Sequence, residues 1–140
     1  MNAPLYTTAI LRLAASIPHL GRLELPDGRA ELRSPTCGST ARVEVRIEGG
    51  RVLELAQEIH ACAFGQASAA LMGAQAVGRD RREATKALTE LSTWLAGERD
   101  DPGSWPGLAE LSPAKPRTGR HGAILLPFRA LLAAIEDAER

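Results

Sequence analysis

Two alternating runs of apolar and polar residues, joined by a pair of glycines, constrain the fold of this chain more than any other feature. Residues 41–48 read ARVEVRIE, and residues 51–59 read RVLELAQEI. Alternation with a period of two predicts strands that bury one face. The apolar positions are Val43, Val45 and Ile47 in the first run, and Leu53, Leu55 and Ile59 in the second. Because Gly49-Gly50 can adopt the backbone of a tight turn, the two runs predict a β-hairpin.

The rest of the chain predicts one more strand and four helices. RAELR at 29–33 is expected to pair with the hairpin, and Pro18 is expected to stop the first helix. Since strands come before most helices without βαβ alternation, we expect an α+β fold, with a three-stranded antiparallel sheet packed against a layer of helices. The length fits a single domain, 1–140. The expected helices are about 5–17, 64–78, 81–97 and about 123 to the end, with irregular loops at 97–106 and 111–120.

Three details of the helices are also expected. Ala84, Leu88, Leu91 and Leu95 should form one buried stripe, and Pro127 should be tolerated because it lies near the first turn of the last helix. Met72 reads as a core residue, Trp94 and Trp105 as packing residues of the helical layer and a loop, and RDRRE at 79–83 as a solvated face.

The overall charge argues against several classes of partner. Lys+Arg and Asp+Glu are both 17, so no net field would attract a nucleic acid or an anionic membrane. No apolar run approaches the roughly 18–20 residues of a spanning helix. The first residues lack the basic region of a signal peptide, and two cysteines make no disulfide framework. We therefore expect a cytoplasmic protein.

Few residues could carry chemistry. Cys37 lies in a turn between two predicted strands, and Cys62 lies where a strand gives way to a helix. A thiol at a helix start is more easily ionised than one in water, although free cysteine is also often a small buried hydrophobe. His121 lies at the start of the last predicted helix, whereas His60 would share a side with Cys62 only if its strand continued. His19 lies elsewhere.

Several common sites are absent. The cysteines and histidines lack zinc-finger spacing. No P-loop, dinucleotide-binding or nucleophile-elbow motif is present either, so nucleotide binding and acyl transfer have no support.

The order of the motifs resembles the iron–sulfur cluster scaffold family that includes IscU, SufU and the N-terminal domain of NifU. The resemblance covers about residues 5–138, and the segment around Cys62 is most similar to the SufU branch. The hairpin GGRVLELAQEIHAC has the family's register, in which the second strand delivers a cysteine. The matching residues are Pro35, Thr36, Cys37 and Gly38, then Cys62 and Ala63, then Gln66, Ala67, Ser68, Ala69 and Met72.

The resemblance implies a metal-binding end of the domain. In the family, three cysteines and an aspartate converge there on a nascent [2Fe–2S] cluster or, in SufU-type members, on zinc. The resemblance implies that Cys37 and Cys62 are cluster ligands. It also implies that a cysteine desulfurase and cluster-acceptor proteins are partners. The chaperone-recognition segment of IscU is not matched by SPAKPRTGR at 112–120, so that partner is not expected.

This chain departs from the family at two ligand positions. Ser39 stands in place of the aspartate, and Gly122, preceded by His121, stands in place of the third cysteine. A single chain therefore offers at most Cys37, Cys62 and His121, one short of a closed four-ligand site. His121 could replace the missing thiolate or be an ordinary loop histidine. Alternatively, a homodimer could supply four thiolates.

Three functions remain open at this stage. The first is a divergent scaffold or carrier that binds a cluster or metal through Cys37 and Cys62 and is not itself an enzyme. The second is a persulfide acceptor resembling SufU, in which Cys37 or Cys62 takes sulfur and passes it on, as one nucleophilic thiol suffices for that. The third is a degenerate paralogue that kept the fold as a binding or regulatory module.

Overall fold

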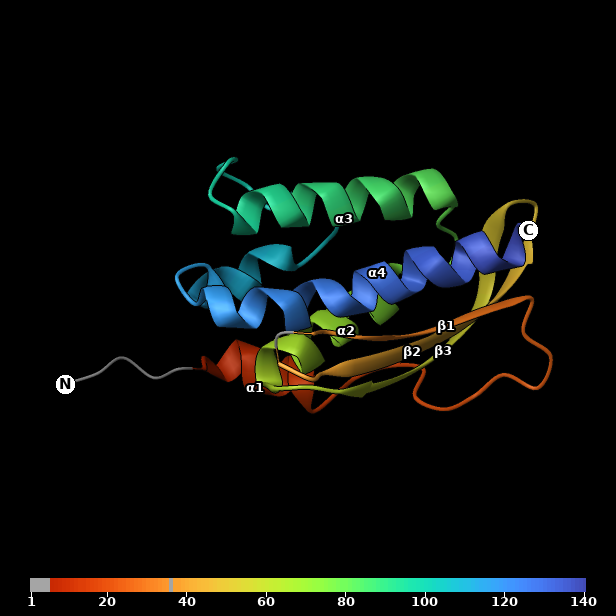
Figure 1. Ribbon diagram of the computed structural model, residues 1–140, viewed down its shortest axis with the longest axis horizontal. Helices are drawn as coiled ribbons and strands as arrows, with labels where there is room; N and C mark the ends of the chain where they lie inside the picture. Colours follow the sequence, from red (N-terminus) through yellow and green to blue (C-terminus); the bar gives the residue numbers. More distant parts are fainter. Residues whose placement is uncertain (1–5, 36) are drawn as a thin grey trace.

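The computed structural model describes residues 6–35 and 37–140, and α4 lies at the centre of the molecule, between α3 and the sheet (Figure 1). The expected α+β architecture is confirmed. The elements run α1 Thr8–Ala14, β1 Gly28–Arg33, β2 Thr40–Glu48, β3 Arg51–His60, α2 Ala63–Gln75, α3 Arg81–Leu95 and α4 His121–Ala138, with short 3₁₀ helices η1 Leu108–Ala114 and η2 Thr118–Arg120.

The three strands form an antiparallel sheet in the order β1-β2-β3, as the sequence predicts. Gly49 and Gly50 both have positive φ in the β2–β3 turn. The apolar face of the hairpin differs from the prediction at one point, because the register shifts between Arg46 and Ile47. As a result Val52 is buried, whereas Leu53 is 45% exposed, so the assignment of Leu53 to the core face is wrong.

The core lies between the sheet and the helices. Val43 and Val45 contribute from the sheet, and the predicted stripe of α3 is buried apart from Leu88, which is half-buried. Met72 and Trp94 are buried, as expected. The largest fully buried side chains include Phe64, Phe128, Ile10, Leu91, Leu108, Leu111, Ile124, Leu131 and Ile135.

Several helical segments differ from the sequence prediction. The first helix ends at Ala14, well before Pro18, with Thr7 as its N-cap; the expected start at residue 5 lies outside the described residues. The segment expected to be an irregular loop at 111–120 contains η1 and η2. The last helix begins at His121, so Pro127 lies in its second turn rather than near its first.

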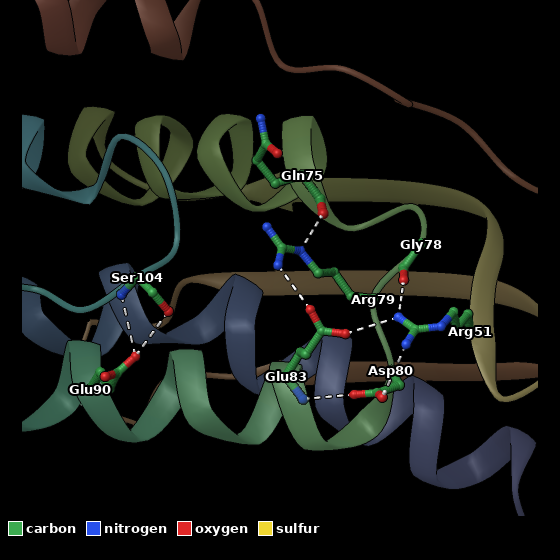
Figure 2. A network of polar contacts seen from close by, with 8 residues as sticks. All are labelled: Arg51, Gln75, Gly78, Arg79, Asp80, Glu83, Glu90 and Ser104. Carbon is green, nitrogen blue, oxygen red and sulfur yellow. Dashed lines mark hydrogen bonds and ion pairs between the residues drawn. The ribbon is translucent and has the colours of Figure 1, made fainter.

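The run at 79–83 lies at the surface, with Arg81 and Arg82 exposed as expected, and its other members form an ion-pair network at the start of α3 (Figure 2). Arg79 donates from Nε to the Gln75 carbonyl at 3.1 Å and from Nη1 to Glu83 at 2.9 Å, with its guanidinium 4.8 Å from the centre of the Trp105 ring. Arg51, from the hairpin, donates to the same carboxylate at 3.0 Å. The network joins the β2–β3 turn to the α2–α3 turn and holds the buried Trp105.

Residues 18–25 cover part of the outer face of the sheet, around Arg42 and Glu44. Leu23 donates its N–H to Glu44 Oε1 at 2.8 Å, and Arg42 donates to the Gly21 carbonyl at 2.7 Å. Both charged residues are buried. None of the helices in 6–35 and 37–140 has the length and apolarity needed to cross a membrane.

Candidate functional site

The loop between β1 and β2 presents Cys37 at one end of the sheet. Two backbone hydrogen bonds close this loop: Ser34 N–H to the Ser39 carbonyl at 2.8 Å, and Gly38 N–H to the Ser34 carbonyl at 2.9 Å. Gly38 has φ +73°, a conformation that favours glycine. Cys37 is exposed on this turn. Thr36, the neighbouring residue of the motif, lies outside the described residues.

The Cys37 sulfur contacts hydroxyl groups of its own loop. Its Sγ is hydrogen bonded to Ser39 Oγ at 3.0 Å, and both Ser34 and Ser39 are buried. This bond lowers the pKa of the Cys37 thiol, and the Ser34 hydroxyl lowers it further. Hydroxyl donors favour the ionised form of sulfur, and the thiolate is the form that binds soft metals or attacks sulfur.

Cys62 is the N-cap residue of α2, so the predicted strand-to-helix junction is confirmed. Its side chain makes no capping hydrogen bond, whereas its carbonyl accepts the Gln66 N–H at 3.0 Å. The Gln66 side chain in turn donates to the Ala61 carbonyl at 3.0 Å. Cys62 is half-buried and packs against the core, so it partly fits the alternative of a small hydrophobe. Its thiol is free for other contacts.

The strand register places the two cysteine segments at the same end of the sheet. Thr40, the first residue of β2, pairs with Arg33 at the end of β1 and with His60 at the end of β3. The loop of Cys37 joins Arg33 to Thr40, and Cys62 follows His60 by two residues. Segments that are well separated in sequence thus converge there.

The start of α4 closes this end of the molecule. A Cβ atom built on Gly122 would lie 2.7 Å from Ser34 Oγ, so α4 touches the Cys37 loop. A Cβ on Gly65 of α2 would lie 3.3 Å from Ala123 Cβ, and the Ser68 hydroxyl donates to the Ile124 carbonyl. Position 122 therefore adjoins both cysteine-bearing segments, as the resemblance implies.

The histidines are held by protein contacts. His121 Nε2 lies 2.9 Å from the Ala114 carbonyl and 3.0 Å from the Lys115 carbonyl, so this nitrogen carries the proton and only Nδ1 is free to bind a metal. His60 is exposed at the end of β3 and contacts Glu58 Oε1 at 2.9 Å. His19, on the covering segment, accepts the Gln57 N–H with its carbonyl.

The described side chains at this end of the sheet do not complete a metal site within one chain. Among the residues that the structure describes, no three His, Cys, Asp or Glu side chains lie close enough to hold a metal ion. Of the ligand positions that the resemblance implies, the described residues offer the thiols of Cys37 and Cys62, with serine and glycine at the other two. These residues do not make a closed four-ligand site by themselves.

Residues 5–101 match the NifU-like N-terminal domain family. The chain belongs to this family of iron–sulfur cluster assembly scaffolds. The match includes both cysteines and ends before His121 and Gly122.

Similar proteins support the membership over most of the chain. The iron–sulfur cluster assembly scaffold protein IscU of Thermotoga maritima is 26% identical over 136 residues, which are 97% of this chain and 96% of that protein. The crystal structure of a NifU-like N-terminal protein from Brucella abortus is 30% identical, covering 96% of this chain and 94% of that one, with a TM-score of 0.91.

A putative scaffold protein of the SUF system from Fervidobacterium islandicum shares the fold. It is 22% identical, covers 94% of this chain and 96% of that one, and has a TM-score of 0.85. Together the NifU-like relatives confirm the family that the cysteine motifs indicate.

The sequence analysis missed one residue at this end. Ser34 is buried, closes the Cys37 loop and lies against Gly122. The only local signal was a serine before proline, which is a common turn pattern and does not by itself indicate a contact with a distant helix.

Proposed function

We propose that this chain is a divergent iron–sulfur cluster scaffold or carrier, holding its cargo through Cys37 and Cys62. A [2Fe–2S] cluster is the expected cargo, with zinc as the other candidate. A cysteine desulfurase would supply sulfur, and acceptor proteins would take the product. We also expect the protein to act in the cytoplasm.

The observation that carries the proposal is the convergence of both cysteine segments at one end of the sheet. Cys37 is exposed on its loop, and the Cys62 thiol makes no capping bond. Thiolates are the ligands that iron–sulfur clusters require, and an exposed position allows cargo to enter and leave.

The remaining ligands can come from one of two sources. A second copy of the chain would add two thiolates, which makes four. His121 would have to bind through Nδ1, because Nε2 donates to the carbonyls of Ala114 and Lys115. Because Nε2–H stays hydrogen bonded to these carbonyls, Nδ1 could bind a metal without breaking the contacts that anchor His121.

The experiment measures iron, zinc and acid-labile sulfide in protein purified without air. We expect iron and sulfide in equal amounts, a visible absorption band, and the loss of both in Cys37→Ala and Cys62→Ala. Because Cys37 is exposed, Cys37→Ala should leave the melting temperature within about 2 °C, so its loss of cargo would not reflect unfolding.

Two further measurements separate the ligand sources. Sedimentation of the loaded protein should report a dimer if two copies share the cluster. His121→Ala should release iron only if Nδ1 is a ligand, and His60→Ala is the matched control at the same end. A wild-type chain that stays free of iron and sulfide after reconstitution would overturn the proposal and favour a binding or regulatory module.

A second function is favoured by the contacts of Cys37. A thiol that is exposed and hydrogen bonded to Ser39 suits a persulfide acceptor. The Cys37 thiolate would attack the outer sulfur of a desulfurase persulfide; the S–S bond breaks, the desulfurase thiolate leaves, and Cys37 carries the transferred sulfur. Cys62, half-buried at the helix start, is the less accessible alternative acceptor.

Mass spectrometry tests this second function. After incubation with a cysteine desulfurase and cysteine, one added sulfur should be found on the Cys37 peptide and should be lost in Cys37→Ala. Zinc without sulfide in the purified protein would favour this function over the cluster scaffold. No added sulfur on either cysteine would contradict it.

A further inference from the structure

We infer that Ser34 and Ser39 are the residues that position the Cys37 sulfur, and that position 122 is glycine because the Ser34 side chain needs its space. The inference deepens the proposed function of the same site and rests on it for its significance. The contacts that carry it belong to the protein alone and do not depend on cargo.

The reason for glycine at position 122 is space rather than backbone conformation. Gly122 is the second residue of α4 and is not among the glycines with positive φ. Glycine is a poorer helix former than alanine, so a helical position keeps it only for another reason. An added Cβ would lie 2.7 Å from Ser34 Oγ but 3.8 Å from Ser34 Cβ. The hydroxyl, and not the rest of Ser34, therefore excludes a side chain there.

Only the Ser34 hydroxyl has to move to free this space, and its surroundings are packed. Ser34 is 4% exposed, and its backbone takes part in both hydrogen bonds that close the Cys37 loop. A hydroxyl pushed aside by a new methyl group would have to move within a buried site. Overpacking of this kind forces side chains out of their preferred rotamers or shifts the backbone.

Ser39 makes the direct contact with sulfur. Its Oγ lies 3.0 Å from Cys37 Sγ, and its carbonyl accepts the Ser34 N–H. The two serines therefore form one unit: Ser39 holds the sulfur, and Ser34 holds the loop on which Ser39 lies. The Ser34 hydroxyl and Gly122 are packed against each other beside the Cys37 loop, so position 122 itself offers no ligand.

For the proposed function, this arrangement means that one chain presents two thiols and cannot gain a third ligand at position 122 while Ser34 is present. The remaining ligands of a cluster must then come from His121 or from a second copy of the chain. The contact with Ser39 already orients the Cys37 sulfur before any cargo is bound.

The steric part is tested with a double-mutant cycle of thermal unfolding on the metal-free chain. Gly122→Ala should lower the melting temperature by several degrees in the wild-type background and much less in a Ser34→Ala background. Gly119→Ala is the matched control, because a Cβ there meets nothing within 4 Å. Equal effects of Gly122→Ala in the two backgrounds would overturn the steric part of the inference.

The positioning part is tested by alkylation of the metal-free chain with iodoacetamide at pH 7, read at both cysteines by mass spectrometry. Ser39→Ala should change the rate at Cys37 by about threefold or more and leave Cys62 unchanged, because the sulfur loses the Ser39 Oγ contact that holds it in place. Ser39→Thr, which keeps the hydroxyl, should restore the rate. A merely structural role would change both cysteines together or neither, and either result would overturn this part.

These results are separate from those for the proposed function. Both tests use the protein without cargo, so they can succeed when iron and sulfide binding fails. Conversely, a chain that binds a cluster normally but shows no coupling between positions 34 and 122 would contradict the inference alone.

Discussion

At the scale of single residues, two different physical reasons account for several of the glycines of this chain. Gly49, Gly50 and Gly78 have positive φ and serve turns, which a sequence pattern indicates well. Gly28 and Gly122 lack positive φ and instead allow close approach of α4 to β1 and to the Cys37 loop. Local sequence does not separate the two reasons, because close approach depends on a partner that is distant along the chain.

Gly28→Ala tests the second reason. A Cβ on Gly28 would collide with the Ala134 carbonyl and lie 2.5 Å from the Ala138 nitrogen. Since both are backbone atoms of α4, they cannot move aside as a flexible side chain would. We expect a loss of about 3 kcal/mol in the free energy of unfolding, measured with urea. Gly119→Ala should stay within about 0.5 kcal/mol; similar losses in both variants would contradict the close packing of β1 on α4.

At the scale of elements, the hairpin shows how far a period-two pattern can be trusted. The pattern identified both strands and the glycine turn, and Val43, Val45 and Leu55 face the core. It failed at Leu53 because a register shift in the ladder changes the side that the following residues face. A bulge is a property of the paired strands, and neither run shows it alone.

Val52→Ala and Leu53→Ala measure this register directly. Val52 is 2% exposed, so its truncation should lower the free energy of unfolding by about 2 kcal/mol. Leu53 is larger but 45% exposed, and its truncation should have an effect of under about 1 kcal/mol. An ideal alternation without the bulge would give the reverse order, which urea unfolding of the two variants would reveal.

The helices illustrate a second limit at this scale. The stripe of α3 was predicted from its spacing, since an amphipathic face is encoded within the helix itself. The end of the first helix and the start of the last one were not predicted correctly. His121 is anchored at the α4 start by carbonyls of Ala114 and Lys115, a contact between elements that no local pattern specifies.

At the scale of the whole molecule, the network around Glu83 links the hairpin turn to the α2–α3 turn (Figure 2). Hydrogen bonding from Arg79, with a further bond from Arg51, lowers the pKa of Glu83 below its ordinary value. A carboxyl with a lowered pKa in the folded state stabilises the fold at neutral pH. That contribution is lost as the pH falls through the folded-state pKa.

Glu83→Gln tests the contribution of this network. Because Glu83 is partly exposed, we expect a loss of under about 1 kcal/mol in the free energy of unfolding at pH 7. The difference from wild type should shrink as the pH falls below the ordinary pKa of glutamate, and disappear once the pH is below the lowered folded-state pKa of Glu83. Urea unfolding over this pH range measures it. A difference independent of pH would show that the pairing of charges is not what matters.

The sequence by itself determined the hairpin, the third strand, the buried face of α3 and the positions of Cys37 and Cys62 in the motifs of their family. These features are encoded within a few neighbouring residues, through side-chain periodicity and turn chemistry. Only the tertiary structure decided that residues 18–25 bury the charged residues Arg42 and Glu44 of β2. It also decided that Ser34 contacts Gly122 beside the Cys37 loop. The physical reason is that burial and close contact depend on which distant segment covers a residue, and that is set by the packing of whole elements.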